Sequence, residues 1–254
     1  LTNTTALEVT PVKDVLNFKA DFTYHYGHSS RFRVENMYQF NKGPAVTGER
    51  QTYSDIENWG YDNKYMSGNV TGHFTPRLGP DHSFSLMAGW NIEDKLYDAI
   101  KTYRQGILYP SQPTFAMMDG EYYAADQDGY SWGIVGGFFR AKYGYKDKYL
   151  AELSGRYDGT SKFPSDQQWG FFPSLSLGWV VSRENFMKGT ESWLDNLKIR
   201  GSVGTLGNGQ VDPYSYLSTM DIAKTSVLID GTQQSYTAAP GLIPSGLTWE
   251  KVTT

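Results

Sequence analysis

The stretch WGFFPSLSLGWVVS, residues 169–182, alternates in polarity with a period of two residues. Large apolar side chains occupy its odd positions, and small or polar ones occupy most even positions: Phe171, Pro173, Leu175, Leu177, Trp179 and Val181 against Ser174, Ser176, Gly178 and Ser182. Because successive side chains of a β-strand point to opposite faces, this pattern predicts a strand with one apolar and one polar face. The apolar face packs on a core in a soluble sheet, but it faces lipid in a membrane barrel.

Similar alternation recurs along the chain and predicts eight strands in all. The other seven lie at residues 16–26, 31–40, 65–75, 83–91, 132–143, 149–158 and 197–203, of which 132–143 is the least regular. A strand of about ten residues, rising ~3.3 Å per residue and tilted by ~45°, spans roughly 24 Å, close to the ~25 Å apolar band of an outer-membrane barrel. Many of the apolar faces also carry an aromatic residue at one or both ends, where interfacial girdles are expected.

The connections between the predicted strands alternate in length. Short turns are predicted at 27–30, 75–82 and 144–148 and a medium one at 183–196, whereas long segments are predicted at 41–62, 92–130, 159–168 and 206–248. Outer-membrane barrels have short periplasmic turns at one rim and longer extracellular loops at the other. A soluble sandwich has no reason to sort its connections in this way. The alternation therefore favours lipid as the medium that the apolar faces meet.

The composition excludes several classes of function. The chain has 254 residues, a net charge of −4 and no Cys, so disulfides and thiolate metal sites are absent. It has no basic cluster that would suggest nucleic acid and no long block of like charge. The mean hydropathy of −0.51 would suggest a soluble protein, but half of every barrel strand faces water. No run approaches the ~18 apolar residues of a membrane helix.

The ends of the sequence indicate a piece of a longer protein. The chain opens LTNTTALEV, without a starting Met or the charged and apolar segments of a signal peptide. It stops at TWEKVTT, at the start of another predicted strand. We therefore interpret residues 1–254 as part of a single outer-membrane β-barrel domain, truncated at both ends.

Three stretches carry long motifs: RYDGTSKF at 156–163, WGFFPSLSLGW at 169–179 and WLDNLKIRGSVGTLGN at 193–208. They resemble the barrel of SusC/RagA-type TonB-dependent transporters of Bacteroidetes. In that family an R-x-D-G-S/T-S-K/R-F loop leads into W-G-x-F-P-S-x-S-x-G-W, and W-L-x-N-L-K-x-R-x-S-x-G-x-x-G-N follows. YKDKYLAELSGRYDG and LTWEKVTT resemble the same family, so the similarity covers roughly residues 131–254, whereas 1–130 agree in strand style only. A match in several parts is specific; one departure is Pro164, where Gly is more usual.

The resemblance implies an all-β fold: an antiparallel transmembrane barrel of about 22 strands around a plug domain, of which this chain holds about a third. It implies import of oligosaccharides or peptides across the bacterial outer membrane, and no enzymatic activity and no cofactor. The implied partners are a SusD-like surface lipoprotein, TonB and outer-membrane lipid. The plug and the TonB box are expected upstream of this sequence.

Ionisable side chains on the polar faces of the predicted strands are candidates to line the lumen. They are Lys19, Asp21, Arg31, Arg33, Glu35, Glu152, Arg156, Asp158, Lys198 and Arg200. Glu152 and Asp158 lie six residues apart on one strand, roughly 20 Å, and a glycosidase pair needs ~5–10 Å. The four His residues show no HxH or HExxH spacing. No catalytic residue and no metal site is therefore predicted.

The segment 92–130 carries tyrosines among acids and amides, which makes it a candidate binding loop. They are Tyr97, Tyr103, Tyr109, Tyr122 and Tyr123. Aromatic side chains with polar neighbours suit the faces of sugars or an interface with a lid protein. The alternative is a loop that only folds over its neighbours, since loops carry function often but not always.

Two other interpretations stay open. One is a soluble all-β binding or structural domain, in which the apolar faces would form a core. The other is a small, complete barrel of eight strands that acts as a passive pore or a structural anchor. Against the small barrel, outer-membrane barrels typically end on an aromatic residue, whereas this chain ends KVTT.

Overall fold

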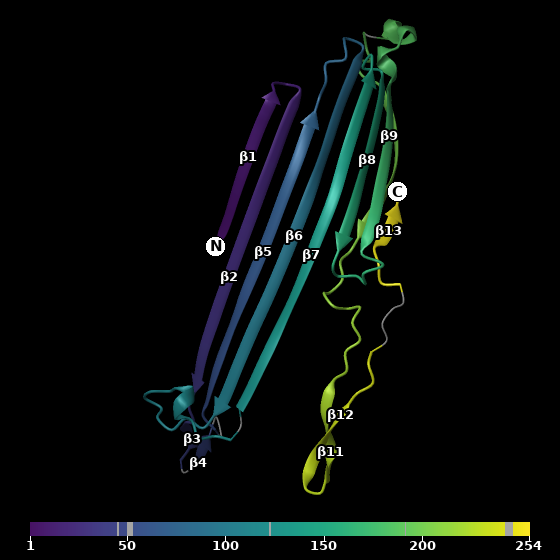
Figure 1. Cartoon of the computed structure of the whole chain (residues 1–254). Helices are drawn as coiled ribbons and strands as arrows, with labels where there is room; N and C mark the ends of the chain where they lie inside the picture. The colour runs from purple at the N-terminus through teal and green to yellow at the C-terminus, as the bar shows by residue number, and fades with distance from the viewer. Residues whose placement is uncertain (45, 50–52, 122, 191, 242–245) are drawn as a thin grey trace. The chain divides into compact units, whose positions relative to one another are not determined.

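The fold is an antiparallel sheet with two short hairpins in its connections (Figure 1). A computed structural model describes residues 1–44, 46–49, 53–121, 123–190, 192–241 and 246–254. The nine strands of the sheet follow the order β1-β2-β5-β6-β7-β8-β9-β10-β13. Their bounds are β1 Thr2–Val12, β2 Leu16–Glu35, β5 Asp55–Phe74, β6 His82–Gln105, β7 Tyr123–Tyr145, β8 Tyr149–Thr160, β9 Trp169–Val180, β10 Lys198–Asn208 and β13 Glu250–Thr253. The predicted all-β antiparallel fold is thus confirmed.

The remaining elements are short. The hairpins are β3 (Gln39–Gly43) with β4 (Val46–Glu49) and β11 (Ile222–Ile229) with β12 (Thr232–Thr237). The 3-10 helices are η1 (Phe115–Met117), η2 (Val181–Arg183) and η3 (Asn185–Thr190). In the part of the chain that the structure describes, no helix has the length and apolarity to cross a membrane.

The chain divides into two compact units. Unit 1 comprises Leu1–Asn3, Thr23–Met66 and Lys95–Ser131; unit 2 comprises Thr4–Phe22, Ser67–Asp94 and Trp132–Thr254. In unit 1, Ile56 and Met118 are buried, and Ser54 accepts hydrogen bonds from the backbone amides of Gly106 and Ile107. In unit 2 the buried apolar residues include Phe163, Phe172 and Val180.

Eight of the nine strands are long, as predicted, but they are not the predicted eight. The turn expected at 27–30 is wrong, because β2 continues through it and joins the expected strands 16–26 and 31–40. Gly27 does not adopt a positive φ, so nothing there reverses the chain. The eighth long strand is β1, whose sequence TNTTALEVTPV has too few large apolar residues to predict it.

The long segments expected at 41–62 and 92–130 are also partly strand. β5 begins at Asp55, β6 continues to Gln105, and β7 begins at Tyr123. The apolar alternation fades in these stretches because polar residues occupy both faces, and the sequence pattern loses its signal there. The connections alternate in the first part of the sheet, with short ones at 13–15, 75–81 and 146–148 and longer ones at 36–54 and 106–122. The expected alternation is wrong after β8, because the connection 161–168 is shorter than the connection 181–197 that follows it.

The turn between β7 and β8 shows why the short connections are tight. Lys146 and Asp147 both have φ of 52°, and the amide of Lys148 donates to the carbonyl of Tyr145 at 2.9 Å. Positive φ at both central residues of the turn 145–148 is typical of the primed β-turns that join antiparallel strands, and it closes this hairpin within three residues.

The register of β7–β10 gives the sheet two unlike faces within unit 2. Tyr143, Ala151, Leu177 and Gly201 pair directly across the four strands and lie on one face, defined here as the apolar face. The next row, Lys142, Glu152, Ser176 and Ser202, lies on the opposite or polar face. The apolar and polar residues that alternate along 169–182 therefore lie on the apolar and the polar face in turn.

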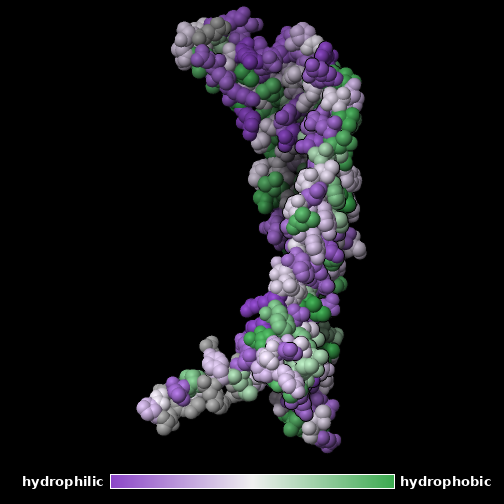
Figure 2. Space-filling model, turned by 90° about the vertical axis from the view of Figure 1, so that its left-hand side faces the viewer, coloured by the Kyte–Doolittle hydropathy of each residue, from purple (hydrophilic) through white to green (hydrophobic). Residues whose placement is uncertain are grey.

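Large side chains of the apolar face are exposed instead of buried. Leu177 is 56% exposed, Ile199 57% and Leu153 48%, and Phe171, Tyr157 and Trp90 also lie open. Figure 2 shows hydrophobic side chains on the molecular surface among hydrophilic ones. Burial of such side chains is the main driving force of folding in water. Their exposure therefore agrees with a face that meets lipid.

A clamp at Trp249 closes the long excursion from 209 to 249 in unit 2. The ring of Trp249 packs edge-on against Phe163 and Phe172, at centroid distances of 5.6 and 5.3 Å, and its Nε1 donates to the carbonyl of Gln168 at 2.8 Å. A Cβ on Gly209 would lie 2.8 Å from the same ring, so both ends of the excursion meet at this tryptophan.

Candidate functional site

The polar face of β7–β10 carries several of the predicted lumen residues as ion pairs. Glu152 on β8 lies between two cations of β7, with its carboxylate oxygens 3.3 Å from Nε of Arg140 and 3.7 Å from Nζ of Lys142. Further along β8, Nε of Arg156 donates to Asp158 at 2.6 Å, and Asp158 is only 6% exposed. The two predicted lumen residues Glu152 and Asp158 are thus held by different cations and do not form a pair with each other.

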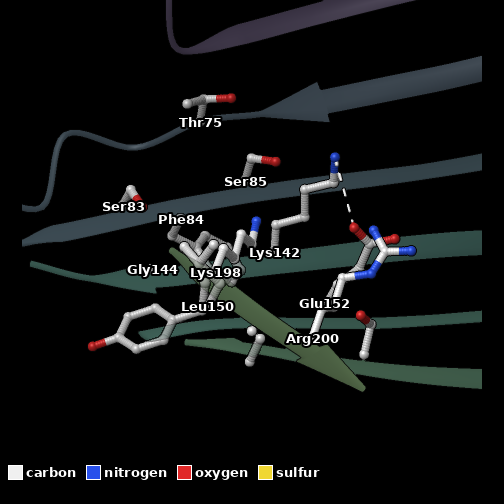
Figure 3. Close-up of a pocket in the computed structure, with 14 residues that line it drawn as sticks. Thr75, Ser83, Phe84, Ser85, Lys142, Gly144, Leu150, Glu152, Lys198 and Arg200 are labelled. Carbon is white, nitrogen blue, oxygen red and sulfur yellow. Dashed lines mark ion pairs between the residues drawn. The ribbon is translucent and has the colours of Figure 1, made fainter. Parts of the chain in front are cut away.

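A cavity of about 380 Å³ opens on this face (Figure 3). Its charged lining residues come from three strands: Lys142 from β7, Glu152 from β8, and Lys198 and Arg200 from β10. The hydroxyl groups of Thr75, Ser83, Ser85 and Ser176 also line it. Three predicted residues, Glu152, Lys198 and Arg200, are therefore brought together, and Lys142 joins them.

The predicted residues of β2 belong to other contacts. In unit 2 the amide of Asn69 donates to Asp21 at 2.8 Å and in turn accepts from Asn91 at 2.8 Å, whereas Lys19 offers its carbonyl to Thr71. This chain of amides links β2, β5 and β6 on the polar side of the sheet.

A second ionic network lies in unit 1. Arg33 pairs with Glu35 on its own strand and reaches two acids of β5, with Nη2 3.4 Å from Glu57 and 3.7 Å from Asp55. Lys101 on β6 pairs with Glu57 at 3.0 Å. The predicted Arg33 and Glu35 therefore connect three strands, whereas Arg31 lies exposed on β2. Lys101, Asp55 and Glu57 were not predicted because their stretches were interpreted as loops.

The predicted tyrosines do not form one loop. Tyr97 and Tyr103 lie on β6, so their placement in a loop is wrong; Tyr103 donates to Asp55 at 3.5 Å. Tyr109 lies in the connection 106–122 and is 58% exposed, and Tyr123 opens β7 and is 74% exposed. Tyr122 lies outside the described residues.

An aromatic ladder crosses β5, β6 and β7 in unit 1. Trp59 and Tyr61 meet edge-on at 5.1 Å, Tyr61 and Tyr97 lie 5.6 Å apart, and Tyr97 stacks on Tyr130 at 5.1 Å. Nζ of Lys95 lies 5.5 Å from the centre of the Tyr130 ring. Of these only Tyr97 was a candidate. Trp59 and Tyr61 stand two residues apart and Tyr130 lies just before the predicted strand 132–143, a signal too short to predict the ladder.

The connection 181–197 is fixed to the strand ends through Glu184. Its carboxylate accepts hydrogen bonds from the Tyr149 hydroxyl at 2.7 Å, the Lys148 ammonium at 3.0 Å and Nε1 of Trp179 at 3.1 Å. These donors, the Tyr149 hydroxyl foremost, lower the pKa of Glu184 to about 2. The carboxylate stays ionised at physiological pH and holds the ends of β8 and β9 to the turn.

Acid–base and metal chemistry find little support in this arrangement. Among the described residues no group of three or more His, Asp and Glu side chains could hold a metal ion. On β8, Glu152 and Asp158 are engaged with Arg and Lys. The site is thus a charged wall with a cavity, suited to binding and to lining a passage.

The fold is similar to that of solved structures of the RagAB transporter. The solved structure of the RagAB peptide transporter superposes with a TM-score of 0.78, over 98% of this chain and 26% of that one, at 17% identity. The RagAB peptide importer in its open-open state gives a TM-score of 0.74 at 16% identity. At such identities the likeness concerns the fold.

The sequence then fixes the family. The family described as "TonB dependent receptor-like, beta-barrel" matches residues 3–254. The chain is 35% identical over 246 residues to the TonB-dependent receptor SusC of Bacteroides thetaiotaomicron, which covers 94% of this chain and 24% of that protein. It is 31% identical over 196 residues to TonB-dependent receptor P26 of Formosa agariphila, covering 74% of this chain and 19% of that protein.

This chain belongs to the TonB-dependent receptor β-barrel family, and it spans about a fifth to a quarter of the length of these relatives. Members of the family are outer-membrane β-barrel proteins and transporters, not enzymes. The predicted SusC/RagA-type relationship is confirmed.

Proposed function

We propose that this chain forms part of the barrel wall of an outer-membrane, TonB-dependent importer of oligomeric nutrients, either glycans or peptides. The observation that carries the proposal is the pair of faces on β7–β10, in a chain of this family. One face exposes large apolar side chains such as Leu177, and the other carries ion pairs and a polar cavity. A wall between lipid and an aqueous lumen needs both.

Residues 1–254 belong, in this proposal, to one barrel domain. The match of a single family model to residues 3–254 supports this. The predicted polar residues of the strands line the lumen. The long connections 106–122 and 209–249 supply part of the extracellular surface for cargo or for a SusD-like lipoprotein, and Tyr109 and Tyr123 are exposed candidates for it.

The alternatives fit the structure less well. In a soluble domain the exposed Leu177 and Ile199 would need a cover. A complete small barrel would pair its first and last strands, whereas β1 and β13 stand at opposite ends of the strand order among the described residues. Unpaired sheet edges are not tolerated in lipid, so these edges call for further strands.

The test is transport by the full-length parent protein. Uptake of labelled oligosaccharides and peptides is measured in cells with and without functional TonB, and the purified protein is examined by single-channel recording. A plugged importer takes up cargo only with TonB and conducts little current alone, because an external energy source must move the plug. Uptake that persists without TonB, together with a steady open-channel current, would show a passive pore.

A further inference from the structure

A second hollow, of about 450 Å³, lies on the apolar face of β7–β10. Its side-chain lining is aromatic and aliphatic and includes Tyr143, Tyr149, Ala151, Leu177, Trp179 and Ile199. Binding sites for small molecules measure about 300–1,000 Å³. This space, called here the apolar hollow, therefore has the size of a ligand site, and the proposed function gives it no role.

The register of the strands creates the apolar hollow. In the row that crosses the four strands, the small residues Ala151 and Gly201 alternate with the large Tyr143 and Leu177. The next row toward the turn 146–148 is large from β8 to β10 and consists of Tyr149, Trp179 and Ile199. The space thus lies over small residues and between large ones.

The apolar hollow does not depend on the parts of a barrel outside residues 1–254. In the proposed barrel it lies on the face away from the lumen. The strands β7, β8 and β9 are each paired on both sides, so Ala151 on β8 has its neighbouring strands in place. A further strand paired with β10 would extend the sheet beside Gly201, three strands away from Ala151, and would not cross the hollow.

The polar atoms of the three aromatic lining residues are turned to partners at the edges of the hollow. The Tyr143 hydroxyl lies 2.7 Å from Nδ1 of His82. The Tyr149 hydroxyl and Nε1 of Trp179 both donate to Glu184, at 2.7 and 3.1 Å. The hollow therefore presents hydrocarbon to an occupant. A sugar or a peptide backbone would leave its own polar groups unsatisfied there, whereas a hydrocarbon chain would not.

One end of the apolar hollow has the features of a membrane–water interface. Trp179 packs edge-on against Phe186 of η3 at a centroid distance of 6.4 Å, and Phe186 is 68% exposed. Aromatic rings with a polar tip on the watery side are typical of this interface. The hollow thus begins at the interface and extends from it toward the middle of the apolar face.

The rim next to Trp179 carries charges of both signs. They form three ion pairs: Lys146 with Asp81, Lys148 with Glu184, and Arg183 with Asp147. The side chains of Arg183 and Asp147 lie 3.2 Å apart and are 54% and 73% exposed. Such an exposed pair is held weakly, so it can exchange partners with the phosphate and the ammonium group of a zwitterionic headgroup.

We propose that the apolar hollow binds one acyl chain of a phospholipid whose zwitterionic headgroup contacts Arg183 and Asp147 at the rim. The inference rests on the proposed function, which places β7–β10 in the outer membrane with the turn 146–148 on the periplasmic side. Lipid tails are as apolar as the wall, so the affinity comes from packing. An empty space between Tyr143 and Leu177 lacks dispersion contacts, and a flexible chain restores them.

The experiment examines the intact parent protein, freed of lipid in detergent, by native mass spectrometry. Phosphatidylethanolamine and phosphatidylglycerol with identical chains are titrated in turn, and the lipid-bound fraction is measured. We expect the wild type to bind phosphatidylethanolamine more tightly than phosphatidylglycerol. Ala151→Leu fills the hollow with an apolar side chain and should weaken the binding of phosphatidylethanolamine about tenfold.

Two further variants separate the chain from the headgroup. The control Ala88→Leu makes the same change at an exposed position of β6, outside the lining, and should bind phosphatidylethanolamine like the wild type. D147N/R183Q removes both charges of the exposed pair and leaves the net charge unaltered. It should lose the preference for phosphatidylethanolamine and still bind both lipids.

The opposite results overturn the inference. Equal binding by Ala151→Leu and the wild type excludes the hollow as the site, and so does an equal loss in Ala88→Leu. Phosphatidylglycerol bound more tightly, or a preference that persists in D147N/R183Q, excludes the headgroup contact. A dimer that Ala151→Leu converts to a monomer without loss of lipid shows that a second copy of the chain fills the hollow. TonB-dependent uptake is measured separately: passive uptake overturns the importer while the hollow can still bind lipid, and a failed lipid site leaves the importer proposal standing.

Discussion

The strand β9 and the last part of β6, residues 95–105, are both regular strand, but they differ in the polarity of the exposed side chains on one side. In β9 the exposed positions are large and apolar, from Phe171 to Trp179. On the same side of β6, exposed Leu96 and Ile100 alternate with Asp98, whose carboxylate accepts a hydrogen bond from Gln127 at 3.0 Å. β6 has 24 residues. At ~3.3 Å per residue and a tilt of ~45°, such a strand rises roughly 56 Å, more than twice the ~25 Å apolar band. The comparison teaches that apolar alternation marks only the part of a strand that fits the apolar band. The strand itself can continue past the band.

The largest expected effect is on the lipid side of β9. Leu177→Arg in the full-length parent should lower the free energy of unfolding by about 2–4 kcal/mol, because it places a charge near mid-membrane. Urea titration of the protein folded into lipid vesicles measures the change. The matched variant Ser176→Arg turns the same charge to the polar face and should cost much less. The reverse ranking of these two variants would end the membrane assignment of β9.

The next effect depends on how much room each face leaves for an added methyl group. A Cβ on Gly136 would overlap Oδ1 of the buried Asp158, whereas a Cβ on Gly201 would meet nothing within 4 Å. Gly136→Ala should therefore cost about 1–3 kcal/mol through displacement of the Arg156–Asp158 pair. Gly201→Ala, on the apolar face, should change stability by less than about 0.5 kcal/mol. The same urea titration compares them, and equal losses would contradict the assigned faces.

A smaller effect concerns the turn that ends β9. The pKa of Glu184 falls from its ordinary value of 4.5 to about 2 in the folded protein. Its contribution to stability is therefore complete above pH 4.5 and is lost as the pH falls toward 2. The difference in urea midpoint between the wild type and Glu184→Gln should therefore shrink as the pH falls over this window. The control is Asp166→Asn, which removes an exposed acid from the loop 161–168, and its difference from the wild type should not follow this pattern. A difference for Glu184→Gln that stays constant from pH 6 to 2 would contradict the three-donor site.

The smallest effect is expected on β6. Leu96 is 42% exposed on the outward side of residues 95–105. If this part of the strand lies beyond the apolar band, Leu96→Arg should change the free energy of unfolding by less than about 1 kcal/mol, as at the edge of the interface. A loss as large as that of Leu177→Arg would place residue 96 within lipid and shorten the extension inferred for β6.

The fold was predictable where lipid shapes the sequence. β8, β9 and polar-face residues such as Glu152 and Arg200 were identified because the other face of these strands is apolar. The strand portions at 55–64 and 92–105 were missed because polar residues occupy both faces there and weaken the period of two. The ionic network of Arg33 with Glu57 and Lys101 depends on which strands are neighbours, and the cavity at Lys198 depends on the register. The spacing of residues along one strand predicts neither the network nor the cavity, because both depend on contacts between strands.

The tryptophan clamp described above has a consequence for how this protein can diversify. Trp249 joins both ends of the excursion from 209 to 249, through Gly209 and through the loop that holds Phe163. Doubling the length of a flexible loop costs only about 0.6 kcal/mol of closure entropy, and here the closure is made by the clamp. We therefore expect insertions, deletions or replacement of residues between the two ends to leave β9 and β10 unaltered. On the proposed extracellular side, the excursion would therefore be a cassette in which surface epitopes can change under pressure from antibodies or phages, and in which foreign peptides can be displayed.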